Sequence, residues 1–388
     1  MFRAGPLRRA RPFKGVTVSY YQARLEKIWD WMADEDISLV MFEDFEPRRD
    51  TTVRWLTGQP GDALLFLSVD RKSLLMPWDT IIAKVYAKAD MVVPYNDFDR
   101  SPLKAIRGAV ERLNIPYGSK IEIPPTTPYP VFLNFVGELS EFDVICRENS
   151  TSNRALNLRM VKDEEEIGIL RKAADITNRI IDVLEKKARS GKIKTEADAA
   201  LLIEVESRKR GCEGTGFETL AAGPDRSFGI HAFPAWTGGP FATQGLSILD
   251  FGLRYRGYNT DVTLTFVRDP SPQQQKMVSL VEAAAEVAKS SIVTGNDTLF
   301  TWLLVEEFFA KSKKKMVHGL GHGVGLDVHE APFFRNRNKT IWDFEPGMVF
   351  AIEPGLYDSV HGGCRLENDF LVTDDGFDIL TEARIIRL

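Results

Sequence analysis

Four acidic residues stand inside apolar, strand-like segments of this 388-residue chain, where a charge is costly. They are Asp250 in SILDFG, Asp261 in YNTDVTLTF, Glu353 in VFAIEPG and Glu367 in RLENDFLV. A carboxylate that is buried without a partner costs several kcal/mol, so it requires a counter-charge or a bound metal ion. Each acid taken alone is explained equally well by a neighbouring arginine or by solvent at a sheet face.

The segments between these acids allow them to converge. Asp250 and Asp261 are joined by the glycine-containing segment FGLRYRGYNT, and Glu353 and Glu367 are joined by a second segment rich in glycine. Each pair can therefore lie on two strands that fold back on each other. Four carboxylates that meet in an apolar setting need compensating positive charge, and divalent metal ions are an economical source of it. We therefore predict a metal site that is built by two hairpins.

The segment HGLGHGVGLDVHE, residues 318–330, holds three of the five histidines of the chain and four glycines. It matches neither the phosphate-binding pattern GxxxxGK[ST] nor the zinc-binding pattern HExxH. Its glycines would let the backbone approach a crowded metal centre closely. One histidine added to four carboxylates makes a donor set that suits Mn, Co, Fe or Zn. Bridging carboxylates could hold two such ions, which together activate a shared water.

The first part of the chain has the pattern of alternating helices and strands. Residues 20–37 and 101–115 show helical spacing of apolar residues, whereas residues 38–44 and 63–69 are short apolar runs of strand type. This alternation predicts an α/β layer domain. The polar stretch ENSTSNRALN shows no period, which places the end of this region near residues 148–156.

The second part has longer helices and strands in mixed order. Residues 163–191 begin with acidic residues, finish with basic ones and stop at Gly191, as helix ends prefer. Three further helices are predicted at 194–211, at 271–292 and around 298–313. The strand-like segments with Asp250 and Asp261 lie before the last two helices, and those with Glu353 and Glu367 lie after them. Such an order predicts an α+β domain in which helices cover an antiparallel sheet.

Composition excludes several classes of partner. A formal net charge of -5 gives no reason to expect binding to nucleic acid or to an anionic membrane. The apolar runs are far shorter than the roughly 20 residues that span a bilayer. Three widely spaced cysteines without a CxxC pattern argue against a disulfide framework and favour the cytoplasm. The first 15 residues carry five positive charges and no acid, which predicts a basic, solvated tail.

The acidic segments and the histidine segment resemble the metallopeptidases of the pita-bread fold, the family of methionine aminopeptidase, aminopeptidase P and prolidase. The family's metal ligands run Asp, Asp, His, Glu, Glu, and the matching residues are Asp250, Asp261, His322, Glu353 and Glu367. The resemblance covers the whole chain. It implies a creatinase-like N-terminal α/β domain at residues 1–152 and a pita-bread α+β catalytic domain at residues 153–388. It also implies a homodimer.

The resemblance further implies two divalent metal ions, with Mn as the first choice and Co, Fe and Zn as alternatives. Asp261 and Glu367 would bridge the ions, and Glu353 would act as general base. His231 in GIHAFP matches a histidine that contacts substrate, and His329 in DVHEAP matches one that stabilises the tetrahedral intermediate. For both histidines a purely structural role is the alternative.

His318 and Arg365 align with substrate-binding positions of the family, again with a structural role as the alternative. An apolar wall of Phe217, Phe228 and Phe233 would accept a proline ring, although core packing explains these three residues equally well.

The implied activity is hydrolysis of short peptides, in the first place Xaa-Pro dipeptides as in prolidase. Xaa-Pro aminopeptidase activity on longer peptides is the alternative. The same fold also serves creatinase-like hydrolases, dimethylsulfoniopropionate lyases and non-enzymatic binding proteins, but these usually alter or lose ligands that are complete here.

Two positions depart from the family pattern. Leu264 replaces an arginine that commonly follows the second aspartate. Phe333 stands where prolidases often place an arginine that holds the C-terminal carboxylate of the substrate, although Arg335 and Arg337 lie close by. The second departure weakens the strict dipeptidase interpretation and leaves the hydrolytic residues untouched.

Overall fold

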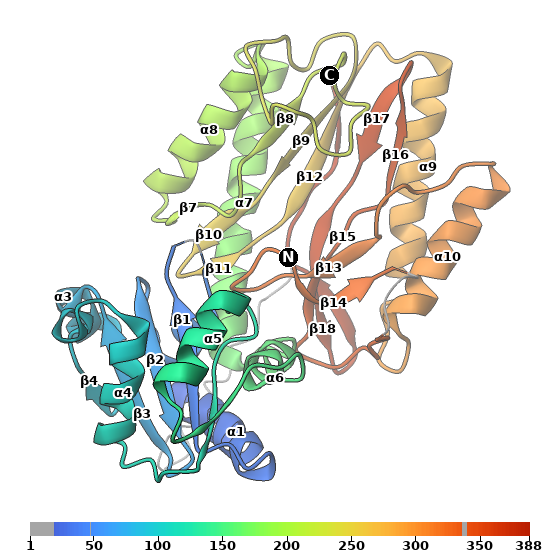
Figure 1. Ribbon diagram of the computed structural model, residues 1–388. Coiled ribbons are helices and arrows are strands. Elements are labelled where there is room, and N and C mark those ends of the chain that lie inside the picture. The colour runs from blue at the N-terminus through green and yellow to red at the C-terminus, as the bar shows by residue number, and fades with distance from the viewer. Residues whose placement is uncertain (1–18, 47, 336–339) are drawn as a thin grey trace, which may run out of the picture.

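The computed structural model describes residues 19–46, 48–335 and 340–388. Figure 1 shows an N-terminal region at the lower left and a larger C-terminal region at the upper right. The basic tail and Arg337 lie outside the described residues. No helix among the described residues is long and apolar enough to cross a bilayer.

The N-terminal region is built on a six-stranded mixed sheet in the order β4-β3-β2-β1-β5-β6. Its strands are β1 (Leu39–Asp44), β2 (Ala63–Ser68), β3 (Lys72–Pro77), β4 (Met91–Val92), β5 (Lys120–Glu122) and β6 (Asp143–Ile145). Its helices are α1 (Tyr20–Asp34), α2 (Thr52–Thr57), α3 (Thr80–Tyr86), α4 (Pro102–Arg112) and α5 (Tyr129–Glu138), with a short 3₁₀ helix η1 (Tyr95–Phe98). Both β1 and β2 are buried along their whole length, as expected for strands inside an α/β layer.

The polar stretch at the end of this region is a helix, which corrects the sequence-based expectation. Helix α6 (Thr151–Leu158) is capped by Ser150, whose side chain accepts from the backbone N–H of Asn153 while the Asn153 side chain returns to Ser150. Two of its residues, Thr151 and Ala155, are buried. The helix was missed because its polar residues serve as caps, and too few apolar residues remain to show a period.

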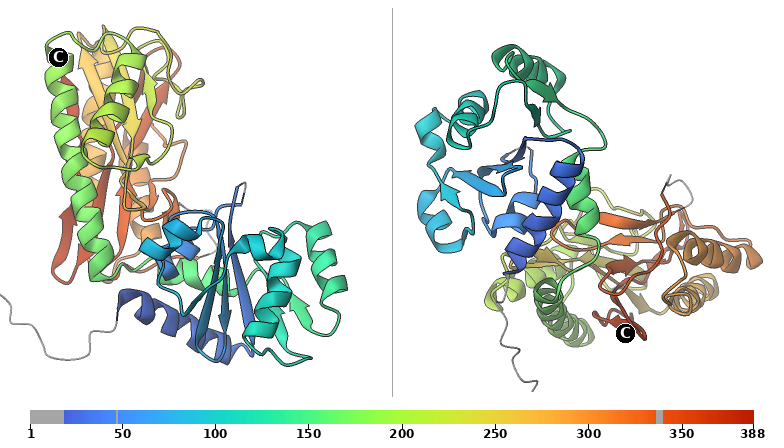
Figure 2. Two further views of the ribbon diagram at one scale, coloured as in Figure 1. Left: turned by 90° about the vertical axis from the view of Figure 1, so that its left-hand side faces the viewer. Right: turned by 90° about the horizontal axis from the view of Figure 1, so that it is seen from below.

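The long helices of the C-terminal region form where the sequence predicts them. They are α7 (Glu164–Arg189), α8 (Glu196–Lys209), α9 (Pro272–Lys289) and α10 (Thr298–Lys311). Asp163 and Glu166 form a capping box at the start of α7, and basic residues occupy its last turn. Figure 2 shows α7 running beside the strands along the length of this region.

Two sheets and a hairpin carry the acidic segments. The four-stranded sheet β20-β12-β9-β8 and the five-stranded sheet β14-β13-β15-β18-β19 are joined by a bridge between Thr263 and Glu367. A small three-stranded sheet, β11-β10-β7, and the hairpin β16–β17 complete the region. The strands are β7 (Gly214–Thr215), β8 (Leu220–Ala222), β9 (Gly245–Phe251), β10 (Leu253–Tyr255), β11 (Tyr258–Asn259), β12 (Val262–Arg268), β13 (Gly321–Gly323), β14 (Glu330–Phe334), β15 (Val349–Ile352), β16 (Gly355–Asp358), β17 (Gly362–Arg365), β18 (Asn368–Thr373), β19 (Gly376–Ile379) and β20 (Ile385–Arg387). Their pairing is antiparallel except between β12 and β20.

One apolar cluster is shared by the two regions. Leu25 and Trp55 from the N-terminal region pack with Ile169, Tyr258 and Val349 from the C-terminal region. A hydrophobic contact of this kind opposes relative motion of the two regions.

Candidate metal centre and active site

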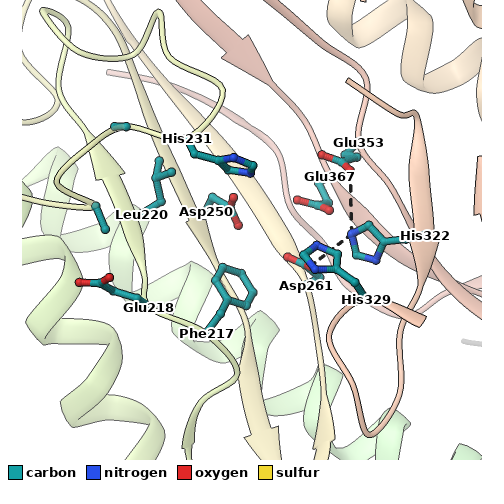
Figure 3. A pocket seen from close by; sticks show the side chains of 12 residues that line it. Phe217, Glu218, Leu220, His231, Asp250, Asp261, His322, His329, Glu353 and Glu367 are labelled. Atoms are coloured by element: carbon teal, nitrogen blue, oxygen red, sulfur yellow. Dashed lines mark ion pairs between the residues drawn. The ribbon is translucent and has the colours of Figure 1, made fainter. Parts of the chain in front are cut away.

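The five predicted ligands come together in one cavity. Asp250 lies in β9, Asp261 directly before β12, His322 in β13, Glu353 directly after β15 and Glu367 directly before β18. All five line a cavity of ≈ 250 Å³, and Figure 3 shows their side chains directed into it. Residues in or next to five strands of two sheets thus bring their donor atoms to one cavity.

The donor atoms are close enough to share bound ions. His322 Nε2 lies 3.7 Å from Asp261 Oδ2 and 3.9 Å from Glu353 Oε1, the two pairs joined by dashed lines in Figure 3. Three overlapping groups each keep one donor atom per residue within 4.8 Å of the others. These groups are Asp261, His322 and His329; His322, Glu353 and Glu367; and Asp250, Asp261 and Glu367.

The protonation preferences of the cluster match a cationic occupant. Burial and the neighbouring carboxylates raise the pKa of Asp261 and of Glu353 well above their usual values. Burial, followed by the charge of Asp250, raises the pKa of Glu367 to about 7. Burial also lowers the pKa of His322 to about 3, so its imidazole is neutral and offers a lone pair. The carboxylates repel one another unless positive charge is added.

Asp250 supplies a direct test of fit. Its Oδ1 is buried and has no hydrogen-bond partner among the described residues, although buried acceptors are usually paired. A divalent ion in this cavity would be coordinated by such an unpaired carboxylate oxygen together with the other oxygen and nitrogen donors. The residues therefore fit Mn, Co, Fe or Zn.

Arg365 lies behind Asp250 and is fully engaged with protein groups. Its Nη2 donates to Asp250 Oδ2, its Nε donates to Thr263 Oγ1 at 2.9 Å, and its Nη1 donates to Tyr357 Oη at 2.7 Å and to the Ile230 carbonyl at 3.0 Å. The side chain is 2% exposed. This placement suits orientation of a metal ligand rather than contact with a substrate.

Two residues that sequence reasoning missed support the ligands. Thr263 Oγ1 donates to Glu367 Oε2 at 2.7 Å, and Asp369 Oδ2 accepts from the backbone N–H of Asp261 at 3.0 Å. Each stands two residues after a predicted ligand, a spacing that puts side chains on the same face of a strand. That spacing is the signal that could have found them.

Both of the predicted catalytic histidines stand at the cavity. His231 and His329 both line it, and both are exposed. The ring of His329 lies edge-on to His322, with centroids 4.1 Å apart. Both imidazoles can therefore reach a molecule in the cavity.

His318 is set back from the cavity. Its Nδ1 lies 3.8 Å from Glu353 Oε2, and its Nε2 is 3.1 Å from Tyr357 Oη. Burial lowers the pKa of His318 to about 4, so it is neutral at physiological pH. It borders a neighbouring hollow together with Arg335.

Two glycines of residues 318–330 permit close packing against neighbouring strands. A Cβ on Gly321 would lie 2.1 Å from the Ala351 carbonyl oxygen, and one on Gly323 would lie 2.1 Å from that of Ala331. These glycines allow β13 to sit between its neighbours with His322 pointing into the cavity.

The proposed aromatic wall is only partly present. Phe217 lines the cavity with Leu220, Ala232 and Ala235, whereas Phe228 and Phe233 are 47% and 97% exposed. The latter two belong to the loop between β8 and β9, which carries them outward. They are therefore not part of a wall for a proline ring.

The two departures from the family pattern have different environments. Leu264 is fully buried in the apolar cluster that includes residues of α7 and α8, so its side chain faces away from the cavity. Phe333 pairs with His322 across β14 and β13, and the Arg335 guanidinium lies 4.9 Å from the centre of its ring.

Comparison with known proteins agrees with this geometry. Residues 168–374 match the model of metallopeptidase family M24. The chain belongs to family M24. The predicted pita-bread fold, and the prolidase and aminopeptidase P branch, are thereby confirmed, and the protein is a metallopeptidase.

Individual relatives extend the likeness beyond the family match. The chain is 34% identical to an uncharacterised peptidase of Methanocaldococcus jannaschii over 60% of this chain and 67% of the relative. It is 27% identical to the Xaa-Pro dipeptidase of Pyrococcus furiosus over 93% of this chain and 98% of that enzyme. The crystal structure of the X-Pro aminopeptidase from Thermotoga maritima superposes with a TM-score of 0.79 at 25% identity, covering 94% and 99% of the two chains.

Proposed function

We propose that this M24 metallopeptidase hydrolyses the bond before proline in short peptides, in the first place Xaa-Pro dipeptides. The observation that carries the proposal is the convergence of five donors and two imidazoles on one cavity of ≈ 250 Å³. Pockets for drug-sized ligands usually measure about 300–1,000 Å³, so this cavity suits a small substrate. The likeness to an Xaa-Pro dipeptidase over nearly the whole chain supports the same substrate class.

The residues proposed to hold two divalent ions are Asp250, Asp261, His322, Glu353 and Glu367. Asp261 and Glu367 each belong to two of the three donor groups, which suits carboxylates shared between ions. Mn is the first choice because the donor set is rich in oxygen, and Co, Fe and Zn remain alternatives. Bound divalent ions would supply a water whose pKa is lowered toward neutrality.

Protein side chains would transfer the proton of the attacking water and stabilise the negative charge that develops on the substrate. The raised pKa of Glu353 suits a carboxylate that accepts a proton from the attacking water and passes it to the leaving nitrogen. His231 and His329, which line the cavity, would donate hydrogen bonds to the substrate carbonyl oxygen as negative charge develops there. Phe217, Leu220 and the two alanines beside them would exclude water around the proline ring.

Dipeptide specificity requires a cation for the free carboxylate of the substrate. Arg335 is proposed for this role in place of the arginine that Phe333 replaces. The Cβ of Arg335 lies 3.8 Å from the position that a Cβ on Gly319 would take. Gly319 follows His318, and His318 and Arg335 border one hollow next to the cavity. His318 would orient the substrate together with Arg335. Arg365 is proposed to orient Asp250 rather than to bind substrate.

Aminopeptidase activity on longer peptides is the second candidate. It is favoured by Phe333, which removes the usual carboxylate grip of a dipeptidase, and by the likeness to an X-Pro aminopeptidase structure.

Hydrolysis of Met-Pro and Met-Pro-Ala by metal-stripped protein reloaded with Mn or Co separates the two candidates. We expect cleavage of Met-Pro, with a rise in KM when Arg335 is replaced by methionine. Cleavage of Met-Pro-Ala alone would establish aminopeptidase activity and contradict the dipeptidase proposal. Failure to cleave either peptide, with metal bound, would point to peptides without proline or to the lyase chemistry of the same fold.

We also propose that residues 1–152 and 153–388 are the two domains, with the boundary inside the first turn of α6, which packs on α1 and α2. The chain is proposed to form a homodimer and to work in the cytoplasm, where its free cysteines Cys146, Cys212 and Cys364 would stay reduced. Sedimentation velocity would test the dimer.

A further inference from the structure

A buried acid stands directly beside the exposed His329. Glu330 Oε2 accepts from Arg159 Nη2 at 2.6 Å, and its Oε1 accepts from Lys162 Nζ at 2.7 Å. The side chains of Glu330, Arg159 and Lys162 are 4%, 2% and 1% exposed. Two cations thus hold one carboxylate out of contact with solvent.

His329 itself has no comparable support. Its imidazole makes no hydrogen bond to any described residue, although it lies edge-on to His322. Apart from this contact with His322, the position of the ring depends on the backbone on either side of it. On the C-terminal side, that backbone is fixed by Glu330.

The preceding backbone is fixed from the other direction. Asn259 Nδ2 donates to the carbonyls of Gly325 at 3.0 Å and Leu326 at 2.9 Å. A Cβ on Gly325 would lie 2.3 Å from Glu330 Oε1, so only glycine lets the carboxylate lie this close. The loop that carries His329 is thus held at both ends by buried polar contacts.

The N-terminal region takes part in the same cluster. Thr51 Oγ1 accepts from Arg159 Nη1 at 2.8 Å and donates to Asp327 Oδ1 at 3.0 Å. Arg159 Nη2 also donates to Asp327 Oδ2 at 2.9 Å. Three separate parts of the chain therefore meet behind the loop: residue 51, residues 159–162 and residues 327–330.

The ion pairs of Glu330 with Arg159 and Lys162 are better explained by the geometry that they fix than by a gain in stability. Burial by itself would raise the pKa of Glu330, but the charges of Lys162 and Arg159 lower it, so the carboxylate stays ionised. Buried ion pairs often stabilise a fold no better than apolar residues of the same volume. In this cluster each charge has defined partners at hydrogen-bond distance, which fixes the geometry of residues 327–330.

We propose that Glu330, held by Arg159 and Lys162, is a positioning residue that fixes His329 at the edge of the cavity. Through Thr51 the N-terminal region becomes part of the framework of the active site. The proposal rests on the function proposed for His329, and it assigns Glu330 an effect that is exerted only through that imidazole.

A double-mutant cycle of Glu330→Gln and His329→Ala tests this dependence. Glu330→Gln should lower kcat by about 10- to 100-fold with KM changed less than about threefold, because misplacement by about 1 Å can cost 100-fold. In the His329→Ala background the same change should lower kcat by less than about twofold, because the group through which it acts is already gone. Effects that multiply instead would overturn the proposal.

Two further variants separate positioning from loss of folding. Glu122→Gln is a matched control, since Glu122 is 1% exposed and accepts from Arg147 Nε at 2.9 Å within the N-terminal region. It should lower thermal stability and leave kcat unchanged. Lys162→Met keeps the Arg159–Glu330 pair and should lower kcat by less than Glu330→Gln, with full metal content. A kcat equal to wild type for both Lys162→Met and well-folded Glu330→Gln would contradict the proposal.

Histidine NMR gives a readout that does not depend on activity. The chain has five histidines, so the ¹³Cε1 signal of His329 can be assigned from its loss in His329→Ala. Glu330→Gln should shift or broaden that signal and leave the signal of His361 in place. An unshifted His329 signal would overturn the proposal even if no peptide were cleaved, whereas a shifted signal without hydrolysis would contradict only the proposed function.

Discussion

The two oxygens of Asp250 have different surroundings. Oδ2 accepts from the buried Arg365, whereas Oδ1 has no hydrogen-bond partner among the described residues. The arginine thus fixes the carboxylate and leaves one oxygen for a metal ion. Groups that orient ligands in this way typically contribute about 10- to 100-fold to metal affinity or activity.

Replacement of Arg365 by methionine should therefore weaken metal binding by about 10- to 100-fold. Arg365→Lys should recover only part of the loss, because lysine keeps the charge but not the fork of donors. Isothermal titration of the stripped protein with Mn measures both. Arg384→Met, at an arginine with 36% side-chain exposure, is the control and should bind Mn as wild type does. If Arg365→Met binds Mn with unchanged affinity but has a higher KM for Met-Pro, then Arg365 binds substrate and does not orient a metal ligand.

Strand β13 holds one of the predicted metal ligands between two neighbouring strands. It lies between β14 and β15 and carries His322, and its glycines let neighbouring carbonyls approach. A larger residue there must push a backbone rather than a flexible side chain.

Gly321→Ala should lower the free energy of unfolding by about 3 kcal/mol, the upper end for overpacking, because its Cβ would lie 2.1 Å from the Ala351 carbonyl oxygen. Gly319→Ala is the matched control in the same segment, since the nearest atom to its Cβ would be 3.4 Å away. It should change stability by less than about 1 kcal/mol. Urea denaturation of metal-stripped protein measures both variants. Equal stability of the two would contradict the steric explanation.

Sequence reasoning succeeded for elements whose signal is local. The helix at residues 164–189 shows its period, its acidic start and its basic end. The five predicted ligands stand in short motifs, and the fold brings them to one cavity. The sequence did not predict helix α6, because its polar residues act as caps. The prediction that Phe228 and Phe233 line the cavity was wrong, because no local pattern indicates whether an aromatic residue in a loop faces a cavity or solvent.

At the scale of the whole molecule, the features that sequence reasoning missed are contacts between distant segments. Arg159 and Glu330 are separated by 171 positions, and Thr51 and Asp327 by 276. Neither pair has a spacing or motif that marks it, so only the folded chain brings it together. These contacts, and the apolar cluster shared by the two regions, make the N-terminal region a support for the loop that carries His329.

The central claim is that the buried carboxylates and His322 hold two ions that serve hydrolysis. The most direct measurement is metal content per chain, by mass spectrometry of reloaded and desalted protein, together with Met-Pro hydrolysis, for wild type and Asp261→Asn. Asp261 is the variant of choice because it belongs to two of the three donor groups. We predict two ions per wild-type chain, and loss of both metal and hydrolysis in Asp261→Asn. Active wild-type protein without bound metal, or an Asp261→Asn variant that keeps two ions and full activity, would contradict the claim.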